Sequence, residues 1–243
     1  MRLLFRLAAA FIAVLPIRAA AQSVDPACHP EIDPARPQYI VGYGSLMQEA
    51  SKRRTTPDAG PNRPVEVTGY QRAWNVKGAT IGFSTTYLGV VKAEGARMAA
   101  AIYRDAKPGD IQATDAREAY YCRDAVPPEA IRLLDDTPAP TNAQYWIYSN
   151  RPEDVAPPTA AFPIVQSYVD IFIGGCIELQ TKVDVPAYSF ADVCVTTTEG
   201  WAAPWVNDRL QPRRPFIHEP LSGQIDALLH RLVPDAFAAI RLE

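Results

Sequence analysis

Short runs of β-favouring residues, separated by glycines, recur through the first two thirds of the chain and predict a sheet of short strands. In the glycine-punctuated stretch from residue 64 to residue 104, valines alternate with polar residues at its start. Such a sheet must bury one face, and we expect the large Trp74 in its core. The predicted strands are residues 39–41, 65–67, 73–76, 80–85, 98–103, 123–126 and 143–149.

Apolar residues at helical spacing predict helices at residues 108–118, 162–180 and 220–232. In the second of these, we expect Gly174 and Gly175 to interrupt the helix. Residues 151–243 look too dependent on neighbouring structure to form a domain of their own. We therefore expect them to pack, as a helical and irregular extension, against a core at residues 38–150.

The first 21 residues have the order of a secretory signal peptide. Arg2 and Arg6 precede an apolar run, and three alanines offer a cleavage site before Gln22. The alternative, a short amphipathic helix of the mature fold, is disfavoured by Pro16. We expect a periplasmic or secreted protein in which residues 22–37, rich in proline, form an extended arm. No other stretch is long and apolar enough to cross a bilayer.

The charge of the chain argues against binding to nucleic acid. Removing residues 1–21 takes away three of the 24 basic residues and none of the 27 acidic ones, which leaves a formal net charge of −6. A protein that neutralises phosphates needs a basic stripe. The one dense basic cluster, Lys52 with Arg53 and Arg54, is interpreted as a solvated loop.

Four cysteines follow the leader: Cys28, Cys122, Cys176 and Cys194. In an oxidising compartment they allow three pairings if two bonds form. We predict at least one disulfide, made by Cys28, because an arm without its own core gains most from a crosslink. Cys176 lies on the apolar face of a predicted helix and is interpreted as a small buried hydrophobe. The cysteines form no C-x-x-C pair and the three histidines are far apart, so we expect no metal cofactor.

The strand at residues 39–41 runs into the sequence Gly42-Tyr43-Gly44-Ser45-Leu46. Two glycines end the strand in a tight loop, and without a side chain at Gly44 the main chain can approach a small ligand closely. Successive backbone N–H groups in such a turn can bind oxygens. Alone, this pattern is more typical of an ordinary turn than of a ligand site.

A second polar group lies at residues 115–123, which read Asp-Ala-Arg-Glu-Ala-Tyr-Tyr-Cys-Arg. Glu118 falls at the C-terminal end of the predicted helix, where the helix dipole disfavours a carboxylate charge and raises its pKa. Asp115 and Arg117 are expected to orient the turn, by pairing with each other and with Arg123, rather than to react.

Together, the Tyr-Gly-Ser-Leu loop and the Asp-x-Arg-Glu-x-x-Tyr-x-Arg segment resemble the γ-glutamylcyclotransferase-like family over residues 38–150. The resemblance implies an α+β fold, a small mixed β-barrel flanked by helices. It implies Glu118 as the catalytic acid/base, with Tyr43, Gly44, Ser45 and Leu46 cradling the substrate. Tyr43 and Tyr121 are expected to supply hydroxyl hydrogen bonds. Where the family often has Gly-Gly after its Glu, this chain has Ala119-Tyr120.

The implied reaction is an intramolecular aminolysis that releases 5-oxoproline from a γ-glutamyl amino acid, peptide or amine, without any cofactor. Two alternatives remain open at this point. A thiol enzyme using Cys122 needs a nearby cationic base, and no His lies near it in the sequence. A binding protein for a γ-glutamyl-type or other small carboxylate ligand would keep the loop without turnover. The small-molecule substrate is the one partner expected, and the sequence predicts no oligomeric state.

Overall fold

The computed structural model describes residues 28–78, 84–105, 107, 109–119, 121–138, 140–201, 204–214 and 220–243. The leader predicted at residues 1–21 and the start of the arm lie outside the described residues. So do most of the strand predicted at residues 80–85, Pro108 at the predicted helix start, and Tyr120.

The strands are β1 Gln38–Gly42, β2 Arg63–Gly78, β3 Thr85–Arg104, β4 Cys122–Val126, β5 Ile131–Leu133, β6 Gln144–Ser149, β7 Ile164–Val165, β8 Thr198–Glu199, β9 Trp205–Asn207 and β10 Arg241–Leu242. The α-helices are α1 Glu49–Arg53, α2 Gly109–Arg117, α3 Gln166–Gln180, α4 Phe190–Thr196, α5 Ser222–Leu232 and α6 Pro234–Ala238. Single 3-10 turns are η1 Ser45–Met47, η2 Pro128–Ala130 and η3 Pro152–Asp154.

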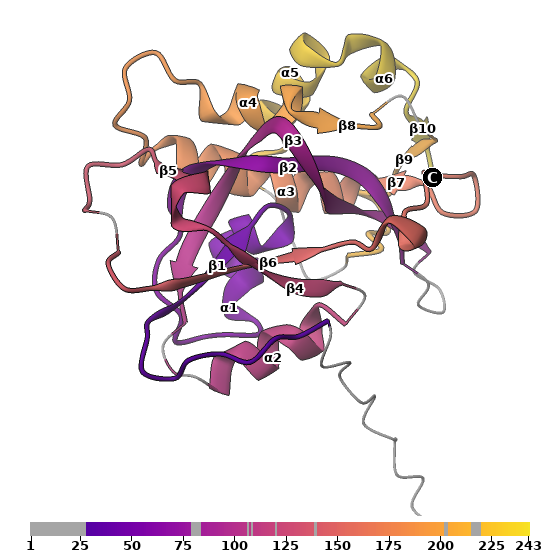
Figure 1. The fold of residues 1–243 in the computed structure, drawn as a ribbon. Coiled ribbons are helices and arrows are strands. Elements are labelled where there is room, and N and C mark those ends of the chain that lie inside the picture. Colours follow the sequence, from indigo (N-terminus) through magenta and orange to yellow (C-terminus); the bar gives the residue numbers. More distant parts are fainter. Residues whose placement is uncertain are drawn as a thin grey trace, which may run out of the picture.

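The fold is α+β, with helices on both sides of a curled, mixed sheet of seven strands (Figure 1). The strand order is β4-β6-β1-β3-β2-β5, and β8 pairs with β2. β1 runs antiparallel to β3 and parallel to β6. Because no pairing joins β4 to β5 among the described strands, the sheet is an open half-barrel rather than a closed barrel.

Because successive side chains of a strand point to opposite faces of the sheet, the apolar residues of one strand contribute to two different cores. In β1, Ile40 contributes to a core that contains Ile111 of α2 and the aromatic residues of one sheet face. Its neighbour Val41 contributes to the larger core, which includes most of the apolar residues of α3 and α4. Trp74 is 1% exposed in this second core, as predicted. The alternation of side chains along the strands thus gives the sheet two apolar faces, and each face packs against helices.

The stretch predicted as several short strands forms mainly one long hairpin, β2 and β3. Two of the glycines that we interpreted as turns, Gly69 and Gly95, do not end the strands. Gly69, with φ +83°, occupies a register shift between Thr68 and Tyr70, and Gly95, with φ +76°, lies within β3. A β-bulge and a tight turn both favour a residue with positive φ, so the local sequence signal is the same for both.

Residues 151–243 supply β8 to the main sheet and α3, α4 and α5 to the larger core. The predicted break at Gly174 and Gly175 is wrong, because α3 is continuous. A Cβ at Gly175 would lie 2.7 Å from the backbone of Met47 and Gln48. The glycine therefore allows α3 to pack closely on the 3-10 turn η1.

The interpretation of residues 52–54 as a solvated loop is wrong for Lys52. This residue lies in α1 with its side chain fully buried, and its Nζ donates to Gly60 O and Asn62 Oδ1 and lies 2.8 Å from Glu49 Oε2.

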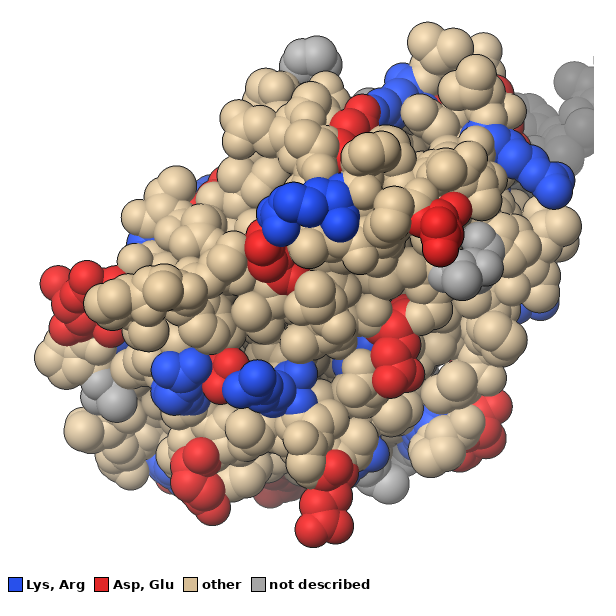
Figure 2. Space-filling model, turned by 90° about the horizontal axis from the view of Figure 1, so that it is seen from above, with Lys and Arg blue, Asp and Glu red and all other residues tan. Residues whose placement is uncertain are grey.

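On the face of the molecule shown in Figure 2, basic and acidic side chains are interspersed among uncharged ones. No helix in the described part of the chain is long and apolar enough to cross a membrane.

Two disulfides join Cys28 to Cys122 and Cys176 to Cys194. The first confirms that Cys28 crosslinks the arm, and it attaches the arm to the start of β4. The interpretation of Cys176 as a small hydrophobe is corrected, since it is buried but bonded to Cys194 of α4.

Replacing both Cys28 and Cys122 by Ala is expected to lower the free energy of unfolding by about 2 to 4 kcal/mol. The bond closes a loop between residues 94 positions apart, so its loss frees a long segment in the unfolded chain. Urea unfolding of the variant and of the wild type, both without reductant, measures the difference. A loss below about 0.5 kcal/mol would show that the arm is held without the bond.

Candidate active site

The loop after β1 is shaped by its two glycines. A Cβ at Gly42 would lie 2.9 Å from Leu46 Cβ, where the chain turns back on itself. A Cβ at Gly44 would lie 2.9 Å from the hydroxyl of Tyr168, a residue of α3. Glycine at position 44 therefore lets a helix from the C-terminal extension approach the loop closely.

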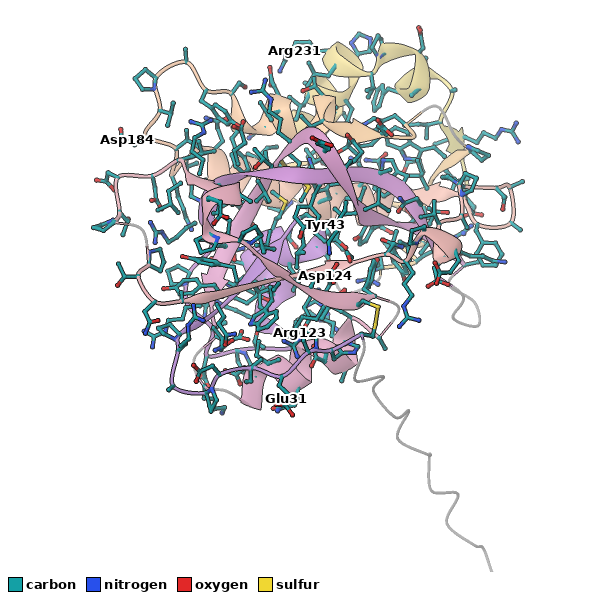
Figure 3. The ribbon with its side chains drawn as sticks, viewed as in Figure 1. Glu31, Tyr43, Arg123, Asp124, Asp184 and Arg231 are labelled. Atoms are coloured by element: carbon teal, nitrogen blue, oxygen red, sulfur yellow. A yellow bond between two sulfur atoms is a disulfide. The ribbon has the colours of Figure 1, made fainter. Side chains whose placement is uncertain are left out.

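Hydrogen bonds hold the rest of the loop. The carbonyl of Tyr43 accepts from Arg72 Nη1 at 3.1 Å, and the Tyr43 hydroxyl donates to Tyr148 O at 2.6 Å in the interior (Figure 3). Ser45 Oγ accepts from Arg117 Nη2 at 2.9 Å. Within the described part of the chain, the backbone amides of residues 44–46 donate no hydrogen bond. The loop is fixed through its carbonyl and side chains, which leaves these N–H groups for a ligand.

Glu118 lies in the turn that follows α2. Its amide donates to Thr114 O and its carbonyl accepts from the amide of Tyr121. Its carboxylate lies 3.1 Å from Arg117 Nε and is 16% exposed. Burial raises the pKa of Glu118 above 4.5, against the opposite effect of the positive charges on Arg117 and Arg214. The direction is the one expected from the sequence, although burial rather than the helix dipole is its main cause.

All six predicted site residues line one recess of about 20 Å³: Tyr43, Gly44, Ser45, Leu46, Glu118 and Tyr121. The recess is continuous with a wider cavity of about 220 Å³, because Ser45, Glu118, Tyr121 and Tyr168 line both. The structure thus brings Glu118 to the loop from 72 or more positions away in the sequence. The recess has room for one polar group such as a carbonyl oxygen, and the wider cavity holds the remainder of a ligand.

The two tyrosines that we expected to donate hydroxyl hydrogen bonds already use their protons within the protein. Tyr43 donates to Tyr148 O, and Tyr121 donates to Leu88 O at 2.9 Å. Burial raises the pKa of both hydroxyls well above 10, so both keep their protons. They can offer only oxygen lone pairs to a ligand, which suits an ammonium group better than a carboxylate.

Three residues of the cavity were missed from the sequence. Tyr168 falls within the helix predicted at residues 162–180, where the sequence gives it no role beyond helical packing. Its hydroxyl, with a pKa raised to about 12 by burial, lies beside Gly44. Tyr87 of β3 and Arg214, which follows β9, line the wider part. The helical spacing around Tyr168 could not distinguish a cavity wall from a core position, and no sequence pattern marks Arg214.

Comparisons with known proteins find structural neighbours only. No family model and no curated protein matches the chain. An uncharacterized protein, loc79017, from Homo sapiens is 11% identical with a TM-score of 0.48, over 67% of this chain and 88% of its own. A γ-glutamyl cyclotransferase is 10% identical with a TM-score of 0.45, over 66% and 99%. A yeast γ-glutamyl cyclotransferase specific to glutathione is 12% identical with a TM-score of 0.38, over 82% and 96%. These likenesses assign no function to this chain.

Arg117 connects Glu118 to the rest of the site. Its Nε contacts Glu118, its Nη1 donates to Ser51 O and Thr55 Oγ1, and its Nη2 donates to Ser45 Oγ and Ser51 Oγ. All five N–H groups of this guanidinium have partners within the protein. Arg117 is a positioning residue that holds the loop, α1 and the carboxylate in one arrangement.

Asp115 and Arg123 pair with each other, as the sequence predicts. Arg123 Nε donates to Asp115 Oδ1 at 2.9 Å, and Tyr148 donates to the same oxygen at 2.7 Å. The expected pairing of Arg117 with Asp115 is replaced by its contact with Glu118. The ion pair joins α2 to β4 across the turn that carries Glu118, and the hydroxyl of Tyr148 adds a bond from β6 to the same carboxylate.

Neither metal ligation nor a thiolate is supported by this region. No cluster of three or more His, Cys, Asp or Glu side chains that could hold a metal ion occurs among the described residues. Cys122 is bonded to Cys28. The thiol enzyme considered from the sequence is therefore excluded while this disulfide is intact.

The raised pKa of Glu118 predicts how stability depends on pH. The folded protein holds this proton more tightly than the unfolded chain, so the wild type loses stability as pH rises from about 4.5 through the folded pKa. Glu118→Gln lacks this titration. The unfolding free energy of the variant relative to the wild type should therefore increase from pH 4 to pH 7, as measured by urea unfolding. A relative decrease over that range would mean that the pKa is lowered.

Proposed function

We propose that the chain releases 5-oxoproline from a γ-glutamyl compound by intramolecular aminolysis. The observation that carries the proposal is the shared recess, which is lined both by Glu118, whose pKa is raised, and by the glycine loop from Tyr43 to Leu46. The reaction needs one base near an amine and donors near a carbonyl oxygen of the same small molecule. The resemblance of the two sequence segments to the γ-glutamylcyclotransferase-like family supports the same assignment.

In this mechanism the ionised Glu118 removes a proton from the substrate α-ammonium. The freed amine attacks the γ-carbonyl carbon, a C–N bond forms, and negative charge moves to the carbonyl oxygen. N–H groups of the Gly44 to Leu46 loop bind that oxygen. The bond from the γ-carbon to the leaving nitrogen then breaks as Glu118 returns the proton to this nitrogen, and the carbonyl re-forms. The ionised Glu118 takes the second proton from the ring nitrogen, which leaves the neutral lactam, and passes it to the released amine or to solvent. Hydroxyl oxygens of Tyr43 and Tyr121 accept hydrogen bonds from the ammonium before proton transfer.

The test is a search for 5-oxoproline after incubation of residues 22–243 with γ-glutamyl dipeptides, γ-glutamylamines and glutathione. Release from at least one class supports the proposal, and the preferred class identifies the leaving group. Absence of 5-oxoproline from all three contradicts it.

A second candidate is a binding protein for the same ligands. The small recess favours it, because most of a γ-glutamyl group must lie in the wider and more open cavity instead of being enclosed by the loop. Calorimetric binding of a γ-glutamyl dipeptide that survives unchanged after long incubation would establish this function in place of turnover.

Export is part of the proposal and rests on residues 1–21 together with the two disulfides, which persist in oxidising compartments. Protein taken from the native host should begin near Gln22 and be periplasmic or secreted. Mass spectrometry that finds an intact Met1 in the cytosol would contradict it.

A further inference from the structure

A separate cavity, of about 420 Å³, lies between the N-terminal arm and α2, which run beside each other in Figure 1. Residues 29–32 of the arm, one face of α2 and Arg123 of β4 form its described walls. None of these residues lines the recess or the wider cavity beside Glu118. The volume is in the range of small-molecule sites, so this cavity is a candidate for a second ligand.

Asp115 offers this cavity a carboxylate oxygen. Its side chain is 9% exposed, and its Oδ1 accepts from Arg123 Nε and from the hydroxyl of Tyr148. Within the described part of the chain, its Oδ2 accepts no hydrogen bond. Each oxygen of an ionised carboxylate can accept, and nearly buried polar groups are usually satisfied. A donor in the cavity would therefore complete the hydrogen bonds of Asp115.

His29 is a second polar group at this wall. Its side chain is 10% exposed, and neither Nδ1 nor Nε2 has a hydrogen-bond partner among the described residues. Nε2 lies 3.9 Å from Asp115 Oδ1, which is beyond hydrogen-bond distance. A neutral imidazole has one donor and one acceptor nitrogen. His29 and Asp115 thus present two acceptors side by side.

The charge of the cavity favours a cation. Arg123 is paired with Asp115, its Nη2 donates to Pro30 O, and its guanidinium lies 4.5 Å from the ring centroid of Trp146. Nη1 has no hydrogen-bond partner in the described structure, and stacking on Trp146 stabilises the guanidinium without one. Glu31 adds a second, exposed carboxylate (Figure 3). One arginine and two carboxylates give the described walls a formal net charge of −1, with His29 counted as neutral.

The remaining walls are apolar. Ile111 is 1% exposed and belongs to the smaller core, against which Ile32 packs. Pro30 and Ala116 add further apolar surface. A ligand that fills the cavity therefore needs an apolar body next to its charged group.

We propose that the cavity between the arm and α2 binds a small organic ammonium ion with an apolar body. The ammonium group donates to Asp115 Oδ2 and to the acceptor nitrogen of His29, and Glu31 adds attraction from the rim. The apolar body packs on Ile32 and Ile111. The site is independent of the proposed function, because it shares no lining residue with the site beside Glu118.

The test is calorimetric titration of residues 22–243 with 2-phenylethylamine, which is an ammonium ion at neutral pH. 2-Phenylethanol has the same apolar body without the charge, and 3-phenylpropionate has the opposite charge. The amine should bind at least about 10-fold more tightly than either of the others. Binding no tighter than that of the alcohol, or no binding at all, overturns the proposal.

Two variants locate the bound amine. Asp115→Asn removes the charge of the acceptor and should weaken binding about 10-fold or more. Ala116→Phe fills the cavity from an exposed position of α2 and leaves Asp115 in place, so it should weaken binding by about as much. Ala116→Phe decides the question if Asp115→Asn does not fold. Unchanged affinity in Ala116→Phe would place the amine elsewhere and contradict the proposal.

Glu31→Gln and Glu129→Gln are a matched pair of charge removals. Both residues are exposed, but Glu129 does not line the cavity. Glu31→Gln should weaken binding of the amine about twofold to fivefold, as expected for an exposed charge. Glu129→Gln should leave the affinity unchanged. Equal effects of the two variants would mean that the amine responds only to the net charge of the protein, and the site would be wrong.

Discussion

Glu118→Gln should lower the rate of 5-oxoproline release by about 100-fold or more while ligands still bind. Gln has nearly the shape of Glu and can accept from Arg117 Nε, so the turn after α2 and its contact with Ser45 through Arg117 should persist. What is lost is the group that takes a proton from the amine. The expected result is therefore a fall in kcat with little change in Kd.

The measurement is single-turnover release of 5-oxoproline, together with calorimetry on the variant. Glu129→Gln is the matched control, because Glu129 is exposed in η2 and does not line the cavity. It should keep wild-type turnover. Near-normal release by Glu118→Gln would assign the base to another residue, and loss of binding with unchanged kcat would make Glu118 a ligand-binding residue.

The sequence predicts the parts of this site that are contiguous in the chain. Gly42 and Gly44 predict a tight loop, and the residues around Glu118 predict the end of a helix. That these two segments share one recess follows from the resemblance, because neither segment carries information about the other. The structure explains the juxtaposition by Arg117, whose guanidinium contacts both Ser45 and Glu118.

Predictions from the sequence are wrong where contacts between distant parts of the chain determine the structure. Lys52 looks like a surface charge, yet it is buried because Gly60 O, Asn62 and Glu49 surround its ammonium group. Gly175 looks like a helix breaker, yet it marks close packing of α3 on η1. Tyr168 lies in the cavity because that packing brings α3 to the loop. In each case the partner lies elsewhere in the chain, and a local pattern could not identify it.

Arg72→Met should lower the free energy of unfolding by roughly 3 to 5 kcal/mol. Arg72 is fully buried in β2, and burial lowers the pKa of its guanidinium to about 9, so it remains charged at neutral pH. No carboxylate of the described residues bonds to it. Its charge is instead stabilised by the carbonyls of Tyr43, Ala99 and Cys194, by Thr198 Oγ1, and by the face of Phe172 at 4.6 Å.

Met fills much of the same volume but has no hydrogen-bond donor. In this variant all of these buried carbonyls therefore lose the hydrogen bond that Arg72 donates to them. The contacts also join β1 and β3 to the C-terminal extension, and one of them holds Tyr43, so surviving folded protein should show reduced turnover as well as reduced stability. Arg97→Met is the control, because Arg97 is an exposed arginine of β3 and its loss should change stability by less than about 0.5 kcal/mol.

Urea unfolding at neutral pH compares these variants with Arg72→Lys, which keeps the charge and has too few donors for all the acceptors of Arg72. The order of stability should be wild type, then Arg72→Lys, then Arg72→Met. If Arg72→Met were as stable as the wild type, the burial of this cation would contribute nothing to holding the loop that carries Tyr43 and Gly44. The position of that loop would then depend on the packing of α3, on the bond from the Tyr43 hydroxyl to Tyr148 O and on the bonds of Arg117.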